Sequence, residues 1–551
     1  MPYENSVIKI YATGLVPNYR QPFASAKSCS WTGSGFILKY GDTPCVVTNA
    51  HVVSNTNFIQ VKLASDSTRY TAKVLKIGHD CDLALLKIED NKFWNMASLL
   101  VLAEKIQVEG KVNVLGFPAG GIDFCMTEGT ITRTEVASYV YNNIPLLTTH
   151  IDASIDHGNS GGPVISVDQT VVGVVHQGGK LGHMIPLPIL THFLDDALNN
   201  KNYQGFPMIS LILQEMENPA LRRYYQLDNA MTGVLVVDVD PFSPAYRLLK
   251  KDDVILQIGP YAIKNDGMIK YPGFNTQIKF THAINMCQLH DSVTFTVLRE
   301  GQKQDISVTL TKVAYETDLH PCLFGQTEPA YFVRAGVVIQ PVSLNLYNSY
   351  VQENVYRGPL VFANVATTRA KKEEKKLKEF VVGAILEDDN TQCYGNLVNT
   401  KIQYINGKSL STMWSAINAF DLNEKPYHII EMTSGQKMVL PKLSTEEDFR
   451  LRKRYQIAHS QASSYMPSSS WRRMLLKLRK HRAELEDKCE ESIKEEKSVL
   501  TTHTNQAMQT TSVETTESDE LPDIDIVSQI DDCTEVGLTV DMSHKRPKKP
   551  S

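Results

Sequence analysis

Three polar side chains in the first third of the chain could together carry out acyl transfer by a serine. This chemistry needs a hydroxyl nucleophile, a base that takes its proton, an acid that orients the base, and N–H donors for the developing oxyanion. Ser160, His51 and Asp82 are the candidates for nucleophile, base and orienting acid. The proton of the serine hydroxyl would pass to the histidine as the oxygen attacks a carbonyl carbon.

Ser160 lies in the glycine-rich run GNSGGP at 158–163. Gly161 and Gly162 leave space beside the hydroxyl for the main chain of a substrate. Gly158 can adopt torsion angles that turn its N–H inward, so the N–H groups of Gly158 and Ser160 are the candidate oxyanion hole. The alternative is a glycine-rich turn with an incidental serine, but the whole six-residue run, followed by a strand-like segment, favours the catalytic role.

The candidate base and acid each stand at the edge of a strand-like segment. His51 lies in TNAHVV at 48–53, where a histidine would usually be a structural core residue. Its place ahead of the serine run favours catalysis. Asp82 opens the apolar run DLALL at 82–86, so the strand can anchor the acid while it points at the base. Asp80 is a competing candidate, and a solvated turn residue is the alternative for either acid; we prefer Asp82 because it adjoins the strand.

Short strand-like segments separated by Gly, Pro and Asn must position these residues. Many short strands with turn signals between them predict a β-barrel or a β-sandwich. A helical spacing of apolar residues over 189–199 predicts a helix that closes the first domain. The expected strands cover residues 46–48, 58–63, 83–88, 112–115 and 171–175.

From residue 205 onward the pattern changes to two smaller modules that look loosely related. In the first module, strands over 234–237 and 292–297 flank one helix that contains Ala245–Leu249. The second module has expected strands at 380–386 and 401–405. Beyond it, charged residues on helix-forming side chains are followed by a segment rich in Thr, Ser, Asp and Glu, a composition typical of disorder.

Several short motifs follow one another in a fixed order: TGSGFI at 32–37, TNAHVV at 48–53, DLALL at 82–86, LGFP at 115–118 and GNSGGP at 158–163. In order and spacing they resemble the Deg/HtrA family of serine proteases. The resemblance is greatest to the plant-type Deg proteases, which share a start like NSVIKI and a GFP entry into the next domain. The order His, Asp, Ser is that of chymotrypsin, not of subtilisin or the α/β-hydrolases.

The resemblance implies a mostly β fold. A trypsin-like double β-barrel protease domain would be followed by two PDZ-like α+β domains and a helical or disordered C-terminal tail. The runs LKKDDVI and NTKIQYINGK are similar to PDZ signatures, with Asp252 in place of the usual glycine. The expected boundaries are an N-terminal segment at 1–29, the protease domain at 30–200, PDZ domains at 205–315 and 318–443, a charged helical segment at 446–500 and a disordered tail at 501–551.

The implied activity is that of an ATP-independent serine endopeptidase that needs no metal or other cofactor. Its substrates would be unfolded, damaged or specific proteins and peptides, with the PDZ domains capturing peptides by strand addition or regulating the enzyme. The family also implies a homo-oligomer, a trimer or a multiple of trimers. Tyr19, Phe23 and Trp31 are candidate contacts, and ordinary packing within the barrel is the alternative for them. The alternative is a PDZ scaffold or chaperone-like binding protein whose protease domain is resting or inactive.

The residues expected to line the specificity pocket depart from the family pattern. By resemblance, GHMIP at 182–186 lines the primary pocket, which usually favours small or medium apolar side chains. His183 and Met184 are bulkier or more polar than is usual there, and His157 is unusual just before Gly158. We therefore expect these three residues to influence which peptide bond is cut.

The overall composition argues against several other classes of function and site. A net charge of -5 gives no indication of nucleic-acid binding. The nine scattered cysteines indicate reduced thiols rather than a disulfide framework or a zinc site. No apolar run suggests a membrane span, and no signal sequence is recognised, so we expect a cytoplasmic-type location. The terminal KRPKK is similar to a nuclear-import cluster but is too short to support that location, and delivery into another cell is also unsupported.

Overall fold

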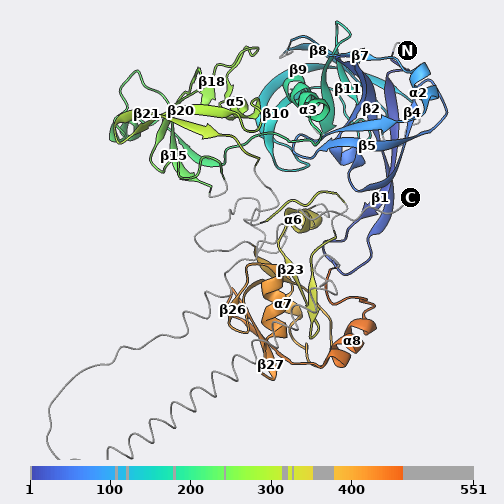
Figure 1. Cartoon of the computed structure of the whole chain (residues 1–551), viewed down its shortest axis with the longest axis vertical. Coiled ribbons are helices and arrows are strands. Elements are labelled where there is room, and N and C mark those ends of the chain that lie inside the picture. Colours follow the sequence, from blue (N-terminus) through green and yellow to red (C-terminus); the bar gives the residue numbers. More distant parts are fainter. Residues whose placement is uncertain are drawn as a thin grey trace, which may run out of the picture. The chain divides into compact units, whose positions relative to one another are not determined.

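The computed structural model describes residues 3–105, 109–118, 123–177, 181–240, 243–312, 320–325, 328–351 and 378–462. Strands dominate these residues, so the prediction of a mostly β chain is confirmed (Figure 1). The predicted disordered tail, and the charged helical segment beyond residue 462, lie outside the described residues.

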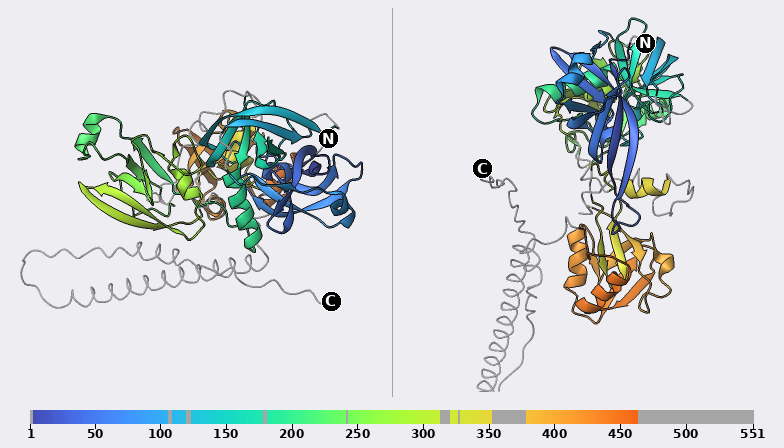
Figure 2. Two further views of the ribbon diagram at one scale, coloured as in Figure 1. Left: turned by 90° about the horizontal axis from the view of Figure 1, so that it is seen from above. Right: turned by 90° about the vertical axis from the view of Figure 1, so that its right-hand side faces the viewer.

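The first barrel closes because its second strand pairs with its first. The strands follow one another in the order β1-β4-β5-β6-β3-β2, and β7 (Leu100–Val101) adds in parallel to β2. Strands β1 and β2 continue past the barrel as a long ribbon (Figure 2), in which Val16 pairs with Lys27. The barrel strands are β1 (Val7–Val16), β2 (Lys27–Tyr40), β3 (Thr43–Thr48), β4 (Thr56–Leu63), β5 (Tyr70–Gly78) and β6 (Leu83–Ile88), and the helices are α1 (Ala50–Val53) and α2 (Asn91–Met96).

The second barrel is also closed, with the strand order β10-β13-β12-β11-β8-β9. Strands β8 to β13 are Gly110–Gly116, Cys125–Ser138, Pro145–Ile151, Pro163–Ser166, Val171–Gln177 and Gly182–Pro186. Helix α3 (Leu187–Asn199) follows directly, as the apolar spacing predicted. The double β-barrel expected from the sequence is therefore present.

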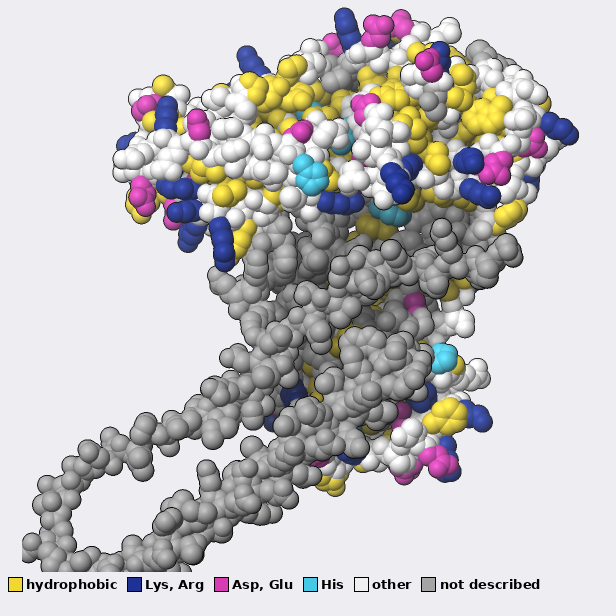
Figure 3. Space-filling model, viewed as in Figure 1, with side chains coloured by type: hydrophobic (Ala, Val, Ile, Leu, Met, Phe, Trp, Pro, Cys, Tyr) yellow, Lys and Arg dark blue, Asp and Glu magenta, His cyan; other side chains and the backbone are white. Residues whose placement is uncertain are grey.

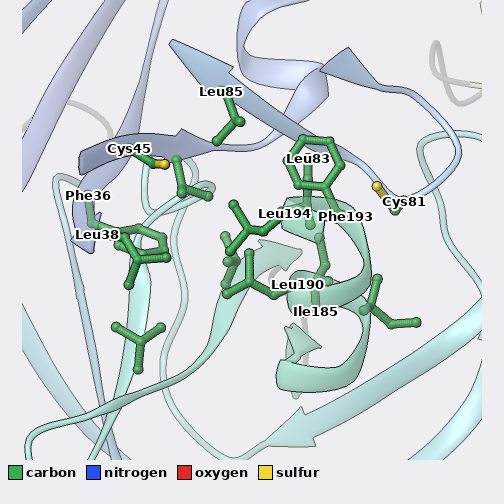
Figure 4. Close-up of a cluster of buried hydrophobic side chains, with 14 of the residues drawn as sticks. Phe36, Leu38, Cys45, Cys81, Leu83, Leu85, Ile185, Leu190, Phe193 and Leu194 are labelled. Carbon is green, nitrogen blue, oxygen red and sulfur yellow. The ribbon is translucent and has the colours of Figure 1, made fainter. Parts of the chain in front are cut away.

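Helix α3 helps to join the two barrels through one shared core. Its residues Leu190, Phe193 and Leu194 have the i, i+3, i+4 spacing that places apolar side chains on one face of a helix. In Figure 4 they face Leu83 and other apolar side chains of the first barrel. This core fixes the strand that carries the candidate acid relative to the second barrel.

The first small module contains a sheet in the order β14-β15-β16-β20-β21, with β14 at one edge. Its strands are β14 (Leu211–Glu215), β15 (Val234–Val239), β16 (Val254–Ile258), β17 (Tyr261–Ala262), β18 (Met268–Ile269), β19 (Ile278–Lys279), β20 (Ser292–Arg299) and β21 (Gln302–Thr309). The helix expected over Ala245–Leu249 is wrong, because this stretch forms turns and Arg247 has a φ of +68°. The helices of this module are α4 (Pro219–Tyr224) and α5 (Thr281–Asn285).

The second small module has the strand order β22-β23-β24-β25-β27-β28, with β26 paired to β25. The strands expected at 380–386 and 401–405 are present as β24 (Phe380–Ile385) and β25 (Lys401–Ile405). The other elements are β22 (Phe332–Arg334), β23 (Val337–Pro341), α6 (Leu344–Val351), η4 (Gly395–Leu397), β26 (Lys408–Ser409), α7 (Met413–Asp421), β27 (Tyr427–Met432), β28 (Lys437–Pro441) and α8 (Thr445–Arg454).

The surface carries charges of both signs. On the face seen in Figure 3, acidic and basic side chains of the described residues are interspersed. Within the described part of the chain, none of the helices has the length and apolar character needed to span a bilayer.

Candidate active site

Asp82 stands at a tight bend directly before β6. Its φ is +56°, in the left-handed region that a residue other than glycine adopts only where its surroundings hold it there. Two donors from the segment that begins α1 hold the bend: Ala50 N–H and Asn49 Nδ2 donate to the Asp82 main-chain oxygen, at 3.1 and 2.9 Å. The bend therefore directs the Asp82 carboxylate toward His51, the residue after Ala50.

The structure brings His51 and Asp82 together. His51 Nδ1 lies 2.8 Å from Asp82 Oδ2 and 3.0 Å from Oδ1, and the His51 main-chain N–H donates to Oδ1 at 2.9 Å. Asp82 is fully buried. Burial by itself lowers the pKa of His51, but the charge and the hydrogen bond of Asp82 outweigh it and raise that pKa above the ordinary value of 6.5. The imidazole is thus oriented and made more basic by one carboxylate.

Asp80, the competing acid, points elsewhere. Its Oδ1 accepts a hydrogen bond from Tyr203 Oη at 2.8 Å, and its Oδ2 accepts one from the Phe206 N–H at 2.9 Å. Of these two acids, it is Asp82 that contacts the histidine ring.

The Ser160 loop packs against the strands that lead to His51. The Ser34 N–H donates to the Ser160 main-chain oxygen at 2.9 Å. Gly161 has a φ of +86°, and a Cβ there would lie 2.4 Å from Thr48 Oγ1 and 3.0 Å from the Asn49 nitrogen. Only glycine permits this approach, which places the loop beside the residues just before the histidine.

The main chain around Ser160 leaves two donors available. Gly158 has a φ of +99°, in the left-handed region that glycine adopts readily. Among the residues that the structure describes, the N–H groups of Gly158 and Ser160 have no hydrogen-bond acceptor. In the same part of the chain no hydrogen bond joins Ser160 Oγ to His51; such contacts are often long without substrate and shorten in the complex.

Ser34 is a residue whose role the sequence did not reveal. Its hydroxyl donates to the Gly158 main-chain oxygen at 2.7 Å and accepts from the Phe117 N–H at 2.8 Å. Thr48 Oγ1 donates to the Ser34 main-chain oxygen at 2.7 Å. The motif that contains Ser34 was noticeable, but the contacts of its hydroxyl depend on residues far away in the sequence.

The sequence also did not indicate the aromatic and imidazole rings that lie near His51. The Tyr141 ring lies 5.9 Å from the His51 ring, and Tyr141 Oη contacts His79 Nδ1 at 2.8 Å. His176 is buried against Tyr139 at 4.6 Å. Burial lowers the pKa of His79 and of His176 to about 4, so both are neutral near pH 7. His51 is therefore the titrating histidine of this group.

The three predicted specificity residues occupy different environments. Met184 is fully buried in an apolar cluster with Ile155 and Val175. His183 lies on the opposite face of its strand, with its ring 4.2 Å from that of His150. His157 is exposed. The structure therefore does not gather these three side chains into one cluster.

Comparison with known proteins places this geometry in a family. A model of the trypsin-like peptidase domain matches residues 33–174, and PDZ domain models match 213–310 and 321–464. The chain is 32% identical to Protease Do-like 4, mitochondrial, of Arabidopsis thaliana, over 74% of this chain and 75% of that protein. This chain belongs to the Deg/HtrA family of serine proteases. The family supports the protease interpretation over that of a scaffold without activity.

A second plant protein and one solved structure are also similar to this chain. Protease Do-like 2, chloroplastic, of Arabidopsis thaliana is 30% identical over 79% of this chain and 71% of that protein. The predicted resemblance to plant-type Deg proteases is thus confirmed. Among solved structures, the HtrA-type protease AlgW with decapeptide is similar at 20% identity and a TM-score of 0.43, covering 56% of this chain and 95% of that one. In this Deg/HtrA chain, no group of three or more His, Cys, Asp or Glu residues among those described could hold a metal ion.

Proposed function

We propose that this Deg/HtrA protein is a serine endopeptidase whose catalytic residues are His51, Asp82 and Ser160. The observation that carries the proposal is the buried Asp82 carboxylate, which contacts both the ring and the main chain of His51 at 2.8 to 3.0 Å. A carboxylate held in this way fixes the tautomer with a proton on Nδ1, and Nε2 is then free to act as the base.

In the proposed reaction, His51 Nε2 takes the proton of Ser160 Oγ as that oxygen attacks the peptide carbonyl carbon. Asp82 stabilises the imidazolium that forms. His51 then gives its proton to the leaving amine, which departs as the acyl-enzyme forms. A water molecule attacks the acyl-enzyme with His51 again as the base, and Ser160 is regenerated.

The proposed oxyanion hole consists of the N–H groups of Gly158 and Ser160. Their lack of acceptors in the described part of the chain supports this role, because both donors can then meet the charge that develops on the substrate oxygen. Ser34 would hold the hole open, since its hydroxyl engages the Gly158 carbonyl oxygen at 2.7 Å and keeps it turned away.

The proposed substrates are unfolded or damaged proteins, or specific proteins with an accessible extended segment. In the first PDZ domain, β14 is an edge strand of its sheet, and an edge strand can accept a peptide as an additional strand. We further propose that residues 182–186 line the primary pocket and that His157 borders its entrance, whereas the fully buried Met184 acts on the pocket only through the packing of this strand. We also propose that the protein forms a trimer or a multiple of trimers, as the family resemblance implies.

The decisive experiment is labelling of Ser160 by a fluorescent fluorophosphonate, with and without a denatured protein substrate. The wild-type chain should be labelled and should cleave the substrate, and Ser160→Ala should do neither while keeping its thermal unfolding midpoint. Cleavage retained by a pure Ser160→Ala sample would contradict the assignment. Labelling only in the presence of substrate would identify a resting enzyme that the substrate activates.

A further inference from the structure

Asp80 is a buried carboxylate that the proposed reaction does not use. Only 4% of it is exposed, and it stands two residues before Asp82. Its partners include residues of the segment between α3 and the first PDZ domain: Tyr203 Oη donates to Oδ1 at 2.8 Å, and the Phe206 N–H donates to Oδ2 at 2.9 Å. Charge-assisted hydrogen bonds of this kind are roughly twice as strong as neutral ones, so the contact is a firm one.

The linker segment that contacts Asp80 can come close to its carboxylate because it contains a glycine. Gly205 has a φ of +98°, and a Cβ there would lie 2.5 Å from Asp80 Oδ2. The Phe206 ring is buried and stacks on His192 at 4.1 Å. Burial and the Asp80 carboxylate raise the pKa of Tyr203 well above its ordinary value, so its hydroxyl remains a donor across the range in which a protease works. These residues form what we term the linker clamp: Tyr203, Gly205 and Phe206.

The linker clamp is connected to the catalytic acid through a single residue. The Cys81 N–H donates to Asp80 Oδ1 at 3.1 Å, and Cys81 Sγ lies 3.4 Å from Tyr203 Oη. Asn142 Nδ2 fixes the other side of the bend by donating to the Asp80 main-chain oxygen at 2.8 Å. The bend from Asp80 to Asp82 is thus held by the linker at one end and by the segment around His51 at the other.

We propose that Asp80 is a positioning residue for catalysis: by binding the linker clamp it keeps Asp82 in its left-handed conformation and in contact with His51. This inference rests on the proposed function. Asp82 at a φ of +56° is a conformation that persists only when its neighbours determine it. Loss of a donor to Asp80 lets the bend relax, and Asp82 then moves away from His51. The linker into the first PDZ domain thereby gains a direct effect on the catalytic pair.

The alternative is that Asp80 only anchors the linker and has no effect on the contact between Asp82 and His51. Tyr203→Phe separates the two explanations, because it removes one donor, keeps the ring and changes no charge. A matched control is Tyr40→Phe, since Tyr40 Oη donates to Asp195 Oδ1 at 2.5 Å and so makes the same kind of contact between a barrel and α3. Both variants lose one tyrosine–aspartate hydrogen bond.

The experiment measures the rate constant of fluorophosphonate labelling from pH 5 to 9 in the full chain, together with the thermal unfolding midpoint. For Tyr203→Phe we expect a loss of about tenfold in the maximal rate, the order of magnitude that a hydrogen bond to a charged group represents. We also expect the acid limb to shift to lower pH, because a weaker contact with Asp82 lowers the pKa of His51. Tyr40→Phe should match the wild type in both. If Tyr203→Phe does not fold, Asp80→Asn takes its place, and the same decrease in rate is expected.

Two results would overturn the inference while leaving the proposed function intact. One is a labelling rate for Tyr203→Phe equal to that of Tyr40→Phe. The other is a lower rate with an unshifted acid limb, which identifies Asp80 as an anchor of the linker only. Labelling that survives Ser160→Ala would instead refute the proposed function, and the inference with it.

Discussion

Asp82 Oδ2 lies 2.8 Å from His51 Nδ1, and the same aspartate has a backbone φ of +56°. The strained main chain and the short contact belong together, because the bend turns the carboxylate back toward α1 instead of along β6. The charge of Asp82 then acts on a ring that burial would otherwise make less basic.

Asp82→Asn should lower kcat by about 10⁴-fold, because an amide cannot hold the His51 tautomer that leaves Nε2 as the base. The measurement is steady-state cleavage of a denatured protein substrate, with circular dichroism to verify folding. Asp66→Asn is the control, since Asp66 also accepts hydrogen bonds from its neighbours but lies on the surface loop before β5. Comparable losses in both variants would argue against a special role for Asp82.

Ser34→Ala should lower kcat by about tenfold, and it should reduce the free energy of unfolding by about 1–3 kcal/mol. The stability loss arises because the buried Phe117 N–H loses its acceptor, and the loss of activity arises because the Gly158 carbonyl oxygen loses its donor. The control is Ser30→Ala, which removes an exposed hydrogen bond between the hydroxyl groups of Ser30 and Thr13. A destabilised but fully active Ser34→Ala variant would show that the hydroxyl does not shape the oxyanion hole.

The pH dependence of kcat/KM should show an acid limb with a midpoint above 6.5, the ordinary pKa of histidine, because Asp82 raises the pKa of His51. The neutral imidazole is the active form, so the rate falls as the pH drops through the raised pKa. The same shift stabilises the folded chain below the ordinary histidine pKa, and this contribution is lost as the pH rises through the raised value.

Among the described residues, Tyr141 lies beside the His51 ring, His79 contacts Tyr141, and His176 is near enough to His51 for their charges to interact; none of the three should produce this limb. Burial keeps His79 and His176 neutral with a pKa of about 4, and it raises the pKa of Tyr141 above the range of the experiment. His176→Asn should therefore leave the midpoint in place, whereas Asp82→Asn should move it to lower pH. An acid limb that follows His176 instead would contradict this assignment.

Met184→Ala should shift cleavage toward larger apolar side chains before the scissile bond, because Met184 is fully buried beside Ile155 and Val175. The free energy of unfolding should fall by about 2–5 kcal/mol, as for other buried methionines. Mass spectrometry of the products from one denatured protein measures the preference, and Met126→Ala, at an exposed methionine, is the control.

His157→Ala should also alter the cleavage profile measured in this way. An unchanged cleavage profile would show that His157 does not border the pocket entrance.

Much of the fold follows from local patterns in the sequence. The apolar spacing of Leu190, Phe193 and Leu194 predicts α3, and the β-branched or alternating runs predict five of the twelve barrel strands, namely β3, β4, β6, β8 and β12. The helix expected over Ala245–Leu249 fails for a reason that composition cannot show. The residues are ordinary helix formers, but Arg247 takes a φ of +68° and the chain closes into turns there. Tertiary contacts override propensity at that place.

The candidate site shows the same difference between what local patterns predict and what tertiary contacts decide. The order of His51, Asp82 and Ser160 can be read from the motifs, whereas the contacts that choose between Asp80 and Asp82 cannot. Tyr203 and Phe206 contact Asp80 although more than a hundred residues separate them in the sequence, and no local pattern predicts these contacts. The role of Ser34 is hidden for the same reason.

The contact between Asp80 and the linker clamp also bears on where a fragment of the protease domain can end. A fragment that ends at residue 200 would keep both barrels and α3 but would lack the two linker donors to Asp80. The bend before β6 would then be held by the segment around His51 but no longer by the linker. A protease fragment intended for crystallisation or activity assays should therefore extend through Phe206.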